Sequence, residues 1–216
     1  MPTFCYYFFL ITPTWICLHN PTVPNMARMY YYSYMNSITP GRFVVPDVVV
    51  THFHLREGDS VADFGAGSGF FLKPLSKAVG PEGKVYAIEI QKGLVDKLGE
   101  YIHLSGLGNV DALWCDLEEV EGIKLENESL DAAIMVNTLF QIQDKETTIK
   151  EIRRVLKRGG VLHVIDWSES FRGLGPQPND VLQKEDAIAL FETQQFILEK
   201  EYPTGDHHYG FTVKKI

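Results

Sequence analysis

Short apolar runs alternate with amphipathic segments over most of the chain. Five runs of mainly apolar residues occur at residues 61–64, 85–90, 110–114, 130–136 and 161–165. Apolar residues recur at helical spacing in segments between them, at residues 70–79, 91–105 and 144–155. Strands that helices cover on both faces are short and almost continuously apolar. The alternation therefore predicts an α/β fold with a doubly wound, mainly parallel sheet.

Further elements are expected on either side of this alternating region. The spacing of apolar residues predicts a helix over residues 40–53. A predicted helix at residues 184–194 and two apolar runs, at residues 196–202 and 208–214, follow the fifth strand. The joint between these runs, residues 203–206, is too short for a parallel crossover. We therefore expect the last two strands to form an antiparallel hairpin.

The first 35 residues differ from the rest of the chain. They contain ten of the 26 aromatic residues and a single charged residue. Three interpretations stay open: an aromatic flap over an apolar substrate, a weak interfacial anchor, or sequence translated upstream of the natural start. Met26, Met29 and Met35 are the later start sites that the third interpretation needs. We treat residues 1–35 as an aromatic-rich extension and expect residues 36–216 to form one domain.

Composition excludes some classes of partner and location. The formal net charge of −8 repels phosphate backbones, so nucleic acid is not expected as a partner. No apolar stretch approaches the roughly 18 residues of a membrane span. The cysteines, Cys5, Cys17 and Cys115, show neither disulfide nor metal spacing, which favours a reducing, cytoplasmic location. A metal site is not expected either, because His52 and His54 would point to different faces of a helix.

A glycine-rich turn lies between the first predicted strand and the helix that follows it. Gly65, Gly67 and Gly69 alternate with small residues. Glycine permits positive φ and lacks a Cβ, so a ligand can approach the backbone N–H groups at the start of the helix. Dinucleotide-binding proteins use G-x-G-x-x-G, but here Phe70 occupies the place of the third glycine. The turn therefore suits a nucleoside-sized ligand better than a pyrophosphate.

Polar residues follow three other predicted strands, at the edge where doubly wound sheets bind ligands. Glu89 ends the second strand and is placed to accept hydrogen bonds from two hydroxyls of a ribose. Asp116 follows the third strand and could accept from an exocyclic amine such as N6 of adenine. Asn137 follows the fourth strand. Together with the glycine turn, these residues predict a nucleoside-binding site.

In these features the chain resembles the class I S-adenosylmethionine-dependent methyltransferases. Residues 61–69 are similar to the family's V-x-D-x-G-x-G-x-G signature, and Glu89 and Asp116 correspond to its acids after the second and third strands. Residues 130–142 are similar to its fourth strand and following loop, and residues 156–162 to the turn and strand that come next. The resemblance implies a Rossmann-like, seven-stranded sheet in the order 3-2-1-4-5-7-6 with the last strand antiparallel.

The resemblance covers residues 40–216 and implies S-adenosylmethionine as the cofactor. The residues that it implies for cofactor binding are Asp63, Gly65, Ala66, Gly67, Gly69, Glu89, Ile90, Asp116, Leu117 and Asn137. Asp63 and the glycines are then expected to face the amino-acid end of the cofactor. Among subgroups the chain looks most like the small methyltransferases of ubiquinone and menaquinone biosynthesis, which implies methyl transfer to a small, hydrophobic acceptor.

The sequence after the fourth strand differs from that of two other methyltransferase subgroups. Residues 136–140 read Val-Asn-Thr-Leu-Phe and lack the prolines and tyrosine of the N/D-P-P-Y motif in amino-group methyltransferases. Cytosine-modifying enzymes use a Cys-Pro dipeptide, but Asp116 follows Cys115 here. Neither amino-base methylation nor a cysteine nucleophile is therefore expected.

No catalytic residue stands out in the sequence. Asp166 and Arg172, at the end of the fifth strand and in the loop after it, are weak candidates on the substrate side. His163 lies inside the fifth predicted strand and is expected to be a packed core residue. His207 and His208 belong to the predicted hairpin and are expected to be solvated.

Three other functions stay open. A nicotinamide oxidoreductase would use the same sheet, but the glycine spacing argues against it. A non-catalytic module would keep the S-adenosylmethionine pocket without transferring a methyl group. An RNA or protein methyltransferase would be favoured by a basic groove beside the pocket, and the net charge of −8 argues against one.

Overall fold

The computed structural model describes residues 43–172 and 175–216 of the chain. The strands of this part are β1 (Ser60–Phe64), β2 (Lys84–Glu89), β3 (Val110–Trp114), β4 (Leu130–Val136), β5 (Leu156–Trp167), β6 (Phe196–Glu201) and β7 (His208–Lys215). The α-helices are α4 (Pro46–Val49), α5 (Leu72–Val79), α6 (Lys92–Leu104), α7 (Lys145–Val155) and α8 (Lys184–Thr193). Short 3₁₀ helices are η1 (Val50–His52), η2 (Leu139–Gln141) and η3 (Pro178–Asp180).

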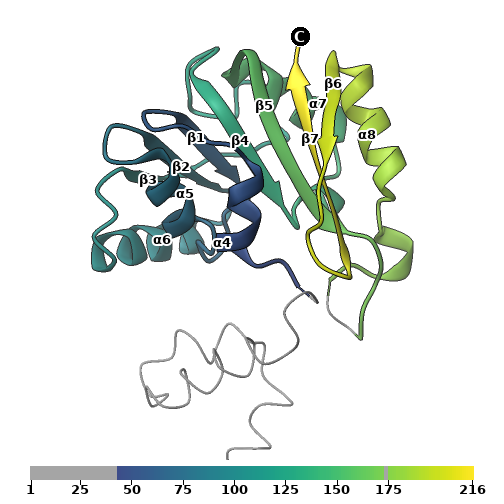
Figure 1. Cartoon of the computed structure of the whole chain (residues 1–216), viewed down its shortest axis with the longest axis horizontal. Helices are drawn as coiled ribbons and strands as arrows, with labels where there is room; N and C mark the ends of the chain where they lie inside the picture. The colour runs from purple at the N-terminus through teal and green to yellow at the C-terminus, as the bar shows by residue number, and fades with distance from the viewer. Residues whose placement is uncertain (1–42, 173–174) are drawn as a thin grey trace, which may run out of the picture. The chain divides into compact units, whose positions relative to one another are not determined.

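The strands form one seven-stranded sheet in the order β3-β2-β1-β4-β5-β7-β6 (Figure 1). Strands β1 to β5 pair in parallel, and β7 runs antiparallel to both β5 and β6. The predicted doubly wound sheet, its order and its antiparallel last strand are confirmed. Because β1 to β5 all end at the same edge, the loops that follow them gather there and position the site.

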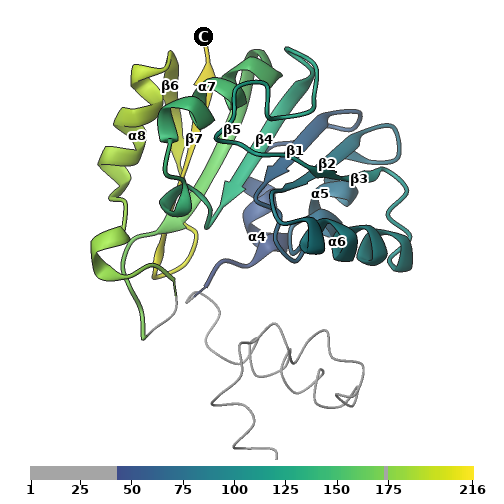
Figure 2. The same cartoon turned by 180° about the vertical axis from the view of Figure 1, so that it is seen from behind.

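Helices cover both faces of the sheet, as a comparison of Figures 1 and 2 shows. On one face, α4, α5 and α6 enclose a hydrophobic cluster that includes Val49, Leu75 and Leu98. On the other face, α7 and α8 enclose a second cluster that includes Ile149 and Phe191. Full burial of such a side chain contributes about 1.5–3 kcal/mol to stability. The strands are apolar toward both faces for this reason.

The predicted first helix is shorter than its apolar spacing suggests. It begins at Pro46 and continues through the 3₁₀ helix η1 to His52. A proline disfavours the helical conformation in the residue before it, and Val45 is extended, with φ −106° and ψ 106°. Proline is well tolerated in the first helical turn. Pro46 therefore starts the helix that the periodicity alone placed earlier.

The Lys-Arg-Gly-Gly sequence at residues 157–160 predicts a turn between the helix at residues 144–155 and the fifth strand. This prediction is wrong, because these residues lie within β5. The pairing of β4 with β5 passes from Leu130 opposite Leu156 to Ala132 opposite Val161. The extra residues of β5 form an irregularity in which Gly159 adopts a φ of 77°. The strand thus continues through a segment whose composition is typical of a turn.

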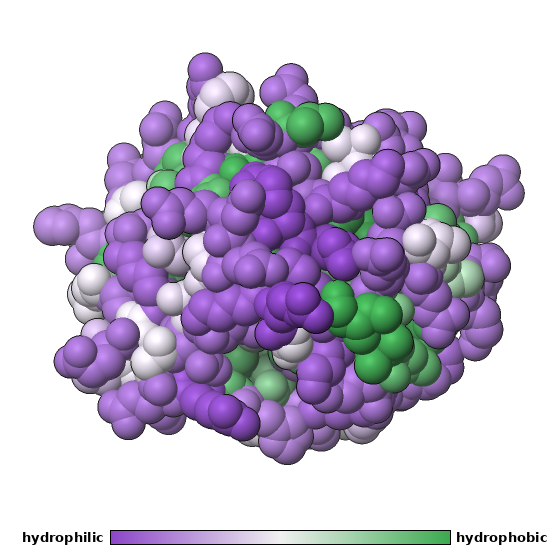
Figure 3. Space-filling model, turned by 90° about the horizontal axis from the view of Figure 1, so that it is seen from above, coloured by the Kyte–Doolittle hydropathy of each residue, from purple (hydrophilic) through white to green (hydrophobic). Residues whose placement is uncertain are grey.

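The predicted extension at residues 1–35 lies outside the described residues, so the three interpretations of it stay predictions. In residues 43–172 and 175–216, no helix has the length and apolar character needed to cross a bilayer. Figure 3 shows one face of the domain, which is mainly hydrophilic with separate hydrophobic patches.

Candidate functional site

The glycine turn after β1 adopts the backbone conformation that its sequence predicts. Gly65, Gly67 and Gly69 have φ values of 79°, 54° and 81°. A Cβ atom on Gly65 would lie 2.4 Å from Oγ1 of Thr138, so no larger residue fits there. The N–H groups of Gly65 and Ala66 donate to the carbonyl oxygen of Ile88 at 2.9 and 3.0 Å. The turn is therefore fixed against both β2 and the loop after β4.

Glu89 connects the end of β2 to the glycine turn. Its side chain is 7% exposed. Oε2 accepts a hydrogen bond from the N–H of Gly67 at 3.1 Å, and Oε1 accepts from the N–H of Gln91 at 2.9 Å. A carboxylate has about four acceptor positions, so two remain for a ligand. Glu89 thus shapes the turn and still has acceptor positions for hydroxyl groups.

Asp63 lies in β1, two residues before Gly65. The side chain is almost completely buried. Burial, with a smaller contribution from the nearby charge of Glu89, raises the pKa of Asp63 to about 7. A cationic group next to this pair of acids would favour the ionised form of both.

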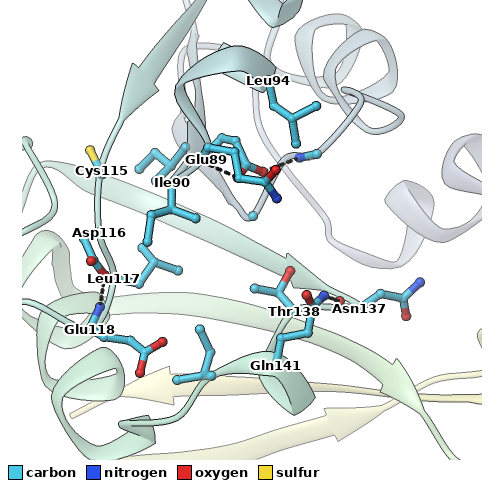
Figure 4. Close-up of a pocket in the computed structure, with 15 residues that line it drawn as sticks. Glu89, Ile90, Leu94, Cys115, Asp116, Leu117, Glu118, Asn137, Thr138 and Gln141 are labelled. Carbon is cyan, nitrogen blue, oxygen red and sulfur yellow. Dashed lines mark hydrogen bonds between the residues drawn. The ribbon is translucent and has the colours of Figure 1, made fainter. Parts of the chain in front are cut away.

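A pocket of about 420 Å³ opens at the edge of the sheet where the parallel strands end. This volume falls within the range of small-molecule sites. Seven of the ten predicted cofactor residues line it: Gly65, Gly67, Glu89, Ile90, Asp116, Leu117 and Asn137 (Figure 4). The other three, Asp63, Ala66 and Gly69, are not among its lining residues. Sequence reasoning missed eight more lining residues: Ile88, Gln91, Leu94, Cys115, Glu118, Thr138, Gln141 and Ile142.

The loop after β3 is held by its own acids. Oδ1 of Asp116 accepts from the N–H of Glu118 at 2.9 Å. Oε2 of Glu118 accepts from the N–H groups of Gln143 and Asp144, at 3.0 and 2.6 Å, just before α7. Cys115 is buried, and burial raises the pKa of its thiol, which favours the neutral form. The expectation that Cys115 is not a nucleophile agrees with this environment.

Asn137 occupies a strained position after β4. Its φ is 54°, which is uncommon for a residue other than glycine. Its carbonyl oxygen accepts from Nε2 of Gln141 at 2.8 Å. Its side-chain Oδ1 is buried, and no described residue donates a hydrogen bond to it. A backbone held in this way, with an unpaired acceptor beside a pocket, is typical of a ligand-binding position.

The two weak catalytic candidates lie outside the lining of this pocket. Asp166 is 1% exposed and accepts from the N–H groups of Trp167, at 2.8 Å, and Phe140, at 3.1 Å. Burial raises the pKa of Asp166 to about 6. Arg172 is exposed, and its guanidinium carbon lies 5.2 Å from the centre of the Phe171 ring. Asp166 therefore holds η2 against the end of β5.

Of the two predictions about histidines, one is confirmed and one is wrong. His163 is a core residue: its ring stacks on Phe53 at 4.2 Å and Nδ1 lies 2.8 Å from Oγ1 of Thr212. Burial lowers the pKa of His163 to about 3, so the ring is neutral. His207 and His208 are each 8% exposed, so the prediction that they are solvated is wrong. Aromatic side chains cover them instead.

Metal ligation was not expected from the sequence. In residues 43–172 and 175–216, no three His, Cys, Asp or Glu side chains are grouped so that they could hold a metal ion. The ring of His52 instead stacks on Tyr202, with 5.5 Å between the ring centres.

Known proteins that are similar to this chain in sequence and structure support the interpretation drawn from the geometry of the site. Residues 62–164 match the family model described as a methyltransferase domain. A SAM dependent methyltransferase from Aquifex aeolicus is 30% identical in sequence and superposes with a TM-score of 0.75, over 81% of this chain and 91% of that chain. The chain belongs to the class I S-adenosylmethionine-dependent methyltransferases. It is thus a methyltransferase domain, with S-adenosylmethionine as its methyl donor.

Curated relatives of this methyltransferase are described as methyltransferases of different kinds. The ubiquinone/menaquinone biosynthesis C-methyltransferase UbiE of Neisseria meningitidis is 28% identical over 121 residues, 56% of this chain and 48% of the relative. Human arsenite methyltransferase is 32% identical over 112 residues, 49% of this chain and 30% of the relative. The aligned part of the chain thus spans half or less of the length of these two relatives.

The donor set of the pocket fits S-adenosylmethionine, which supplies a methyl group already activated by the positive sulfur. Glu89 and Asp116 line the pocket with carboxylates, a kind of group that accepts hydrogen bonds from hydroxyl and amino groups such as those of a nucleoside. Ile90, Leu94 and Leu117 line it with apolar surface. Methyl transfer needs mainly alignment of the reacting groups and exclusion of water, which a preformed pocket at the end of a rigid sheet can give.

Proposed function

We propose that this methyltransferase methylates a small, hydrophobic acceptor. The observation that carries the proposal is the similarity to UbiE, a ubiquinone/menaquinone biosynthesis C-methyltransferase, over 56% of the chain. An aromatic cluster of Phe43, Phe171 and His207 at the edge of the sheet where the parallel strands end supports an acceptor of this kind.

The charge of the chain supports a small molecule over a polymer. RNA and DNA require a basic surface, whereas the formal net charge here is −8. An RNA or protein methyltransferase and a non-catalytic S-adenosylmethionine-binding module are the alternatives. A cytoplasmic location is part of the proposal, since the cysteines show no disulfide spacing.

The proposal also assigns parts of the cofactor to residues. Glu89 accepts from the ribose hydroxyls, and Asp116 from the exocyclic amine of adenine. Gly65 and Gly67 allow the backbone to approach the amino-acid end, with Asp63 behind them. Asn137 Oδ1, which no described residue satisfies, is a further acceptor for the amino-acid end.

Calorimetry and an acceptor screen test the proposal. The full chain should bind S-adenosylmethionine and should not bind NADH, and it should form S-adenosylhomocysteine when hydrophobic small molecules are added. Glu192→Gln, an exposed position on α8, is the matched control for substitutions of acids in the pocket. Tight cofactor binding without turnover on any small molecule would identify a binding module, and turnover on RNA or protein alone would identify the other alternative.

A further inference from the structure

Buried polar atoms without partners gather just before β7 and at its start. In the part of the chain that the structure describes, nine side-chain nitrogen and oxygen atoms are buried without a hydrogen bond. Five of these nine belong to residues 204–209: Oγ1 of Thr204, Nε2 of His207, Nδ1 and Nε2 of His208, and the hydroxyl of Tyr209. Buried polar groups nearly always have partners, so such a concentration calls for an explanation.

His207 is oriented by a carboxylate. Its Nδ1 lies 2.6 Å from Oε1 of Glu169, in the loop after β5. A carboxylate only accepts hydrogen bonds, so this contact assigns the proton of the neutral ring to Nδ1. Nε2 then carries the lone pair, and it is the ring atom that no described residue contacts by a hydrogen bond. A carboxylate that orients an imidazole in this way prepares it to accept a proton.

The surroundings of His207 are aromatic. Phe171 stacks on its ring at 3.9 Å with an interplanar angle of 24°, and the Phe43 ring lies 5.7 Å away. Beside it, His208 packs on Trp167 with 4.2 Å between the ring centres. Flat apolar surfaces next to a few oriented polar atoms are typical of a small-molecule site.

The sheet brings this cluster to the edge that carries the cofactor pocket. Asn137, which lines the pocket, donates from its N–H to the carbonyl oxygen of Ile165 in β5 at 2.9 Å. On the other side of β5, the N–H of Ser168 donates to the carbonyl oxygen of His207 at 3.0 Å. Two strand spacings, about 10 Å, therefore separate Asn137 from His207 across the sheet, and two residues of β5, about 7 Å, separate them along the strands. A small molecule can span this distance.

We propose that Glu169, His207 and His208, together the β7 acceptor site, bind the methyl acceptor, and that His207 accepts a proton from a hydroxyl group of that acceptor. The inference rests on the proposed function. The acceptor oxygen loses its proton to Nε2 of His207 and forms a bond to the methyl carbon. The bond from that carbon to the sulfonium sulfur breaks, and the sulfur keeps the electron pair. The products are a methyl ether, S-adenosylhomocysteine and protonated His207, which returns its proton to water.

The aromatic surfaces select the probe for the test, 2-naphthol, which has one weakly acidic hydroxyl on a flat ring system. Full-length protein with ¹⁵N-labelled histidine is saturated with S-adenosylhomocysteine and titrated with 2-naphthol. The Nε2 resonance of His207, assigned by its loss in His207→Gln, is expected to shift. The side chain of Glu169 is half exposed, so Glu169→Gln is expected to fold. The same titration of this variant tests the site without the carboxylate. Absence of a shift in the wild-type protein overturns the inference.

Turnover gives the second readout. With S-adenosylmethionine and 2-naphthol, the wild-type protein is expected to form 2-methoxynaphthalene. His207→Gln should lower the rate at least about a hundredfold, the usual contribution of a general base, while cofactor affinity by calorimetry stays unchanged. Glu192→Gln on α8 is the control.

Failure of the inference can be told apart from failure of the proposed function. Equal rates for His207→Gln and the wild-type protein overturn the inference and leave small-molecule methylation intact. A wild-type protein that methylates no small molecule overturns the proposed function, and the resonance of His207 then decides alone whether the β7 acceptor site binds an aromatic hydroxyl compound.

Discussion

Replacement of Asp63 by Asn tests whether the buried acid behind the glycine turn has a raised pKa. Asp63 is 3% exposed, and burial together with the nearby Glu89 raises its pKa from 3.8 to about 7. In the unfolded chain the same carboxyl loses its proton near pH 4. Between these values the folded state holds a proton that the unfolded state has released. Folding is therefore linked to proton uptake at Asp63.

The sign and size of the effect follow from the two pKa values. Because the folded state binds more protons, the contribution of Asp63 to stability falls as the pH rises from about 4 to about 7. A shift from 3.8 to about 7 corresponds to about 4 kcal/mol, which is fully lost above pH 7. Asn has the same shape and no charge. Asp63→Asn should therefore stabilise the cofactor-free protein by up to about 4 kcal/mol near pH 8, and by little near pH 4.

Urea denaturation across this pH range is the assay. The wild-type profile also contains His163, whose pKa is lowered to about 3, and this residue makes stability fall as the pH decreases below about 6.5. The difference between wild type and Asp63→Asn at each pH removes this and other shared contributions. Only a difference in unfolding free energy between wild type and Asp63→Asn that grows with pH is explained by Asp63.

Two results would refute the reasoning. A difference that stays constant with pH would mean that Asp63 does not titrate between pH 4 and pH 7 in the folded state. Destabilisation by Asn near pH 8 would mean that the ionised carboxylate has compensating partners. Calorimetry then relates Asp63 to the cofactor: if the acid faces a cationic group, wild-type affinity rises with pH, and Asp63→Asn removes that rise.

Three further substitutions test the site and the loops around it. Glu89→Gln should weaken S-adenosylmethionine binding about ten- to a hundredfold by calorimetry, through loss of charged acceptor positions; unchanged affinity would exclude the ribose assignment. Gly65→Ala should destabilise the domain by about 1–3 kcal/mol, measured by urea denaturation, because Gly65 has a φ of 79° and a Cβ there would lie 2.4 Å from Thr138. The control is Gly99→Ala on α6, where a Cβ meets open space, and this change should be neutral or stabilising. Near pH 4, where the buried acid carries its proton, Asp166→Ala should cost about 1–3 kcal/mol of stability through lost backbone hydrogen bonds. It should leave cofactor affinity unchanged, and weaker cofactor binding would contradict the role of Asp166 in holding η2.

The strands themselves were predictable because they depend on local patterns, whereas their order was implied by the resemblance to the methyltransferase family. Continuous apolar runs identified the parallel strands, and the short joint at residues 203–206 required the antiparallel hairpin. The irregularity at residues 157–160 was not predictable, since the same Lys-Arg-Gly-Gly sequence would serve a turn. Its strand conformation depends on tertiary contacts: Nζ of Lys157 lies 2.6 Å from Oδ1 of Asp131 in β4, and Oδ2 of Asp131 accepts from the N–H of Ser60 in β1 at 3.0 Å.

The burial of His207 and His208 was also beyond local sequence. Polar residues in a hairpin loop are usually solvated, and nothing in residues 203–210 indicates otherwise. The rings that cover His207 come from Phe43, before α4, and from Phe171, after β5. Contacts between segments so distant in the chain appear only when the fold is complete.

The signature at residues 61–69 mixes two kinds of glycine that sequence cannot separate. Gly65 and Gly67 line the pocket, whereas a Cβ on Gly69 would lie 3.0 Å from the side chains of Leu72 and Leu98. Gly69 therefore allows α6 to pack against the start of α5. Both kinds have positive φ. The spacing of glycines thus predicts the shape of the turn, but not which of them a ligand meets.

The same ambiguity applies to the acids at the ends of the strands. Glu89, Asp116, Glu118 and Asp166 each accept hydrogen bonds from backbone N–H groups of the loops that surround the site. A carboxylate offers more acceptor positions than these bonds use, so one residue can fix a loop and also bind a ligand. Loss of stability and loss of affinity are therefore separate measurements for each acid. The ratio of lost affinity to lost stability distinguishes Glu89, which lines the pocket, from Asp166, which only supports the loops beside the pocket.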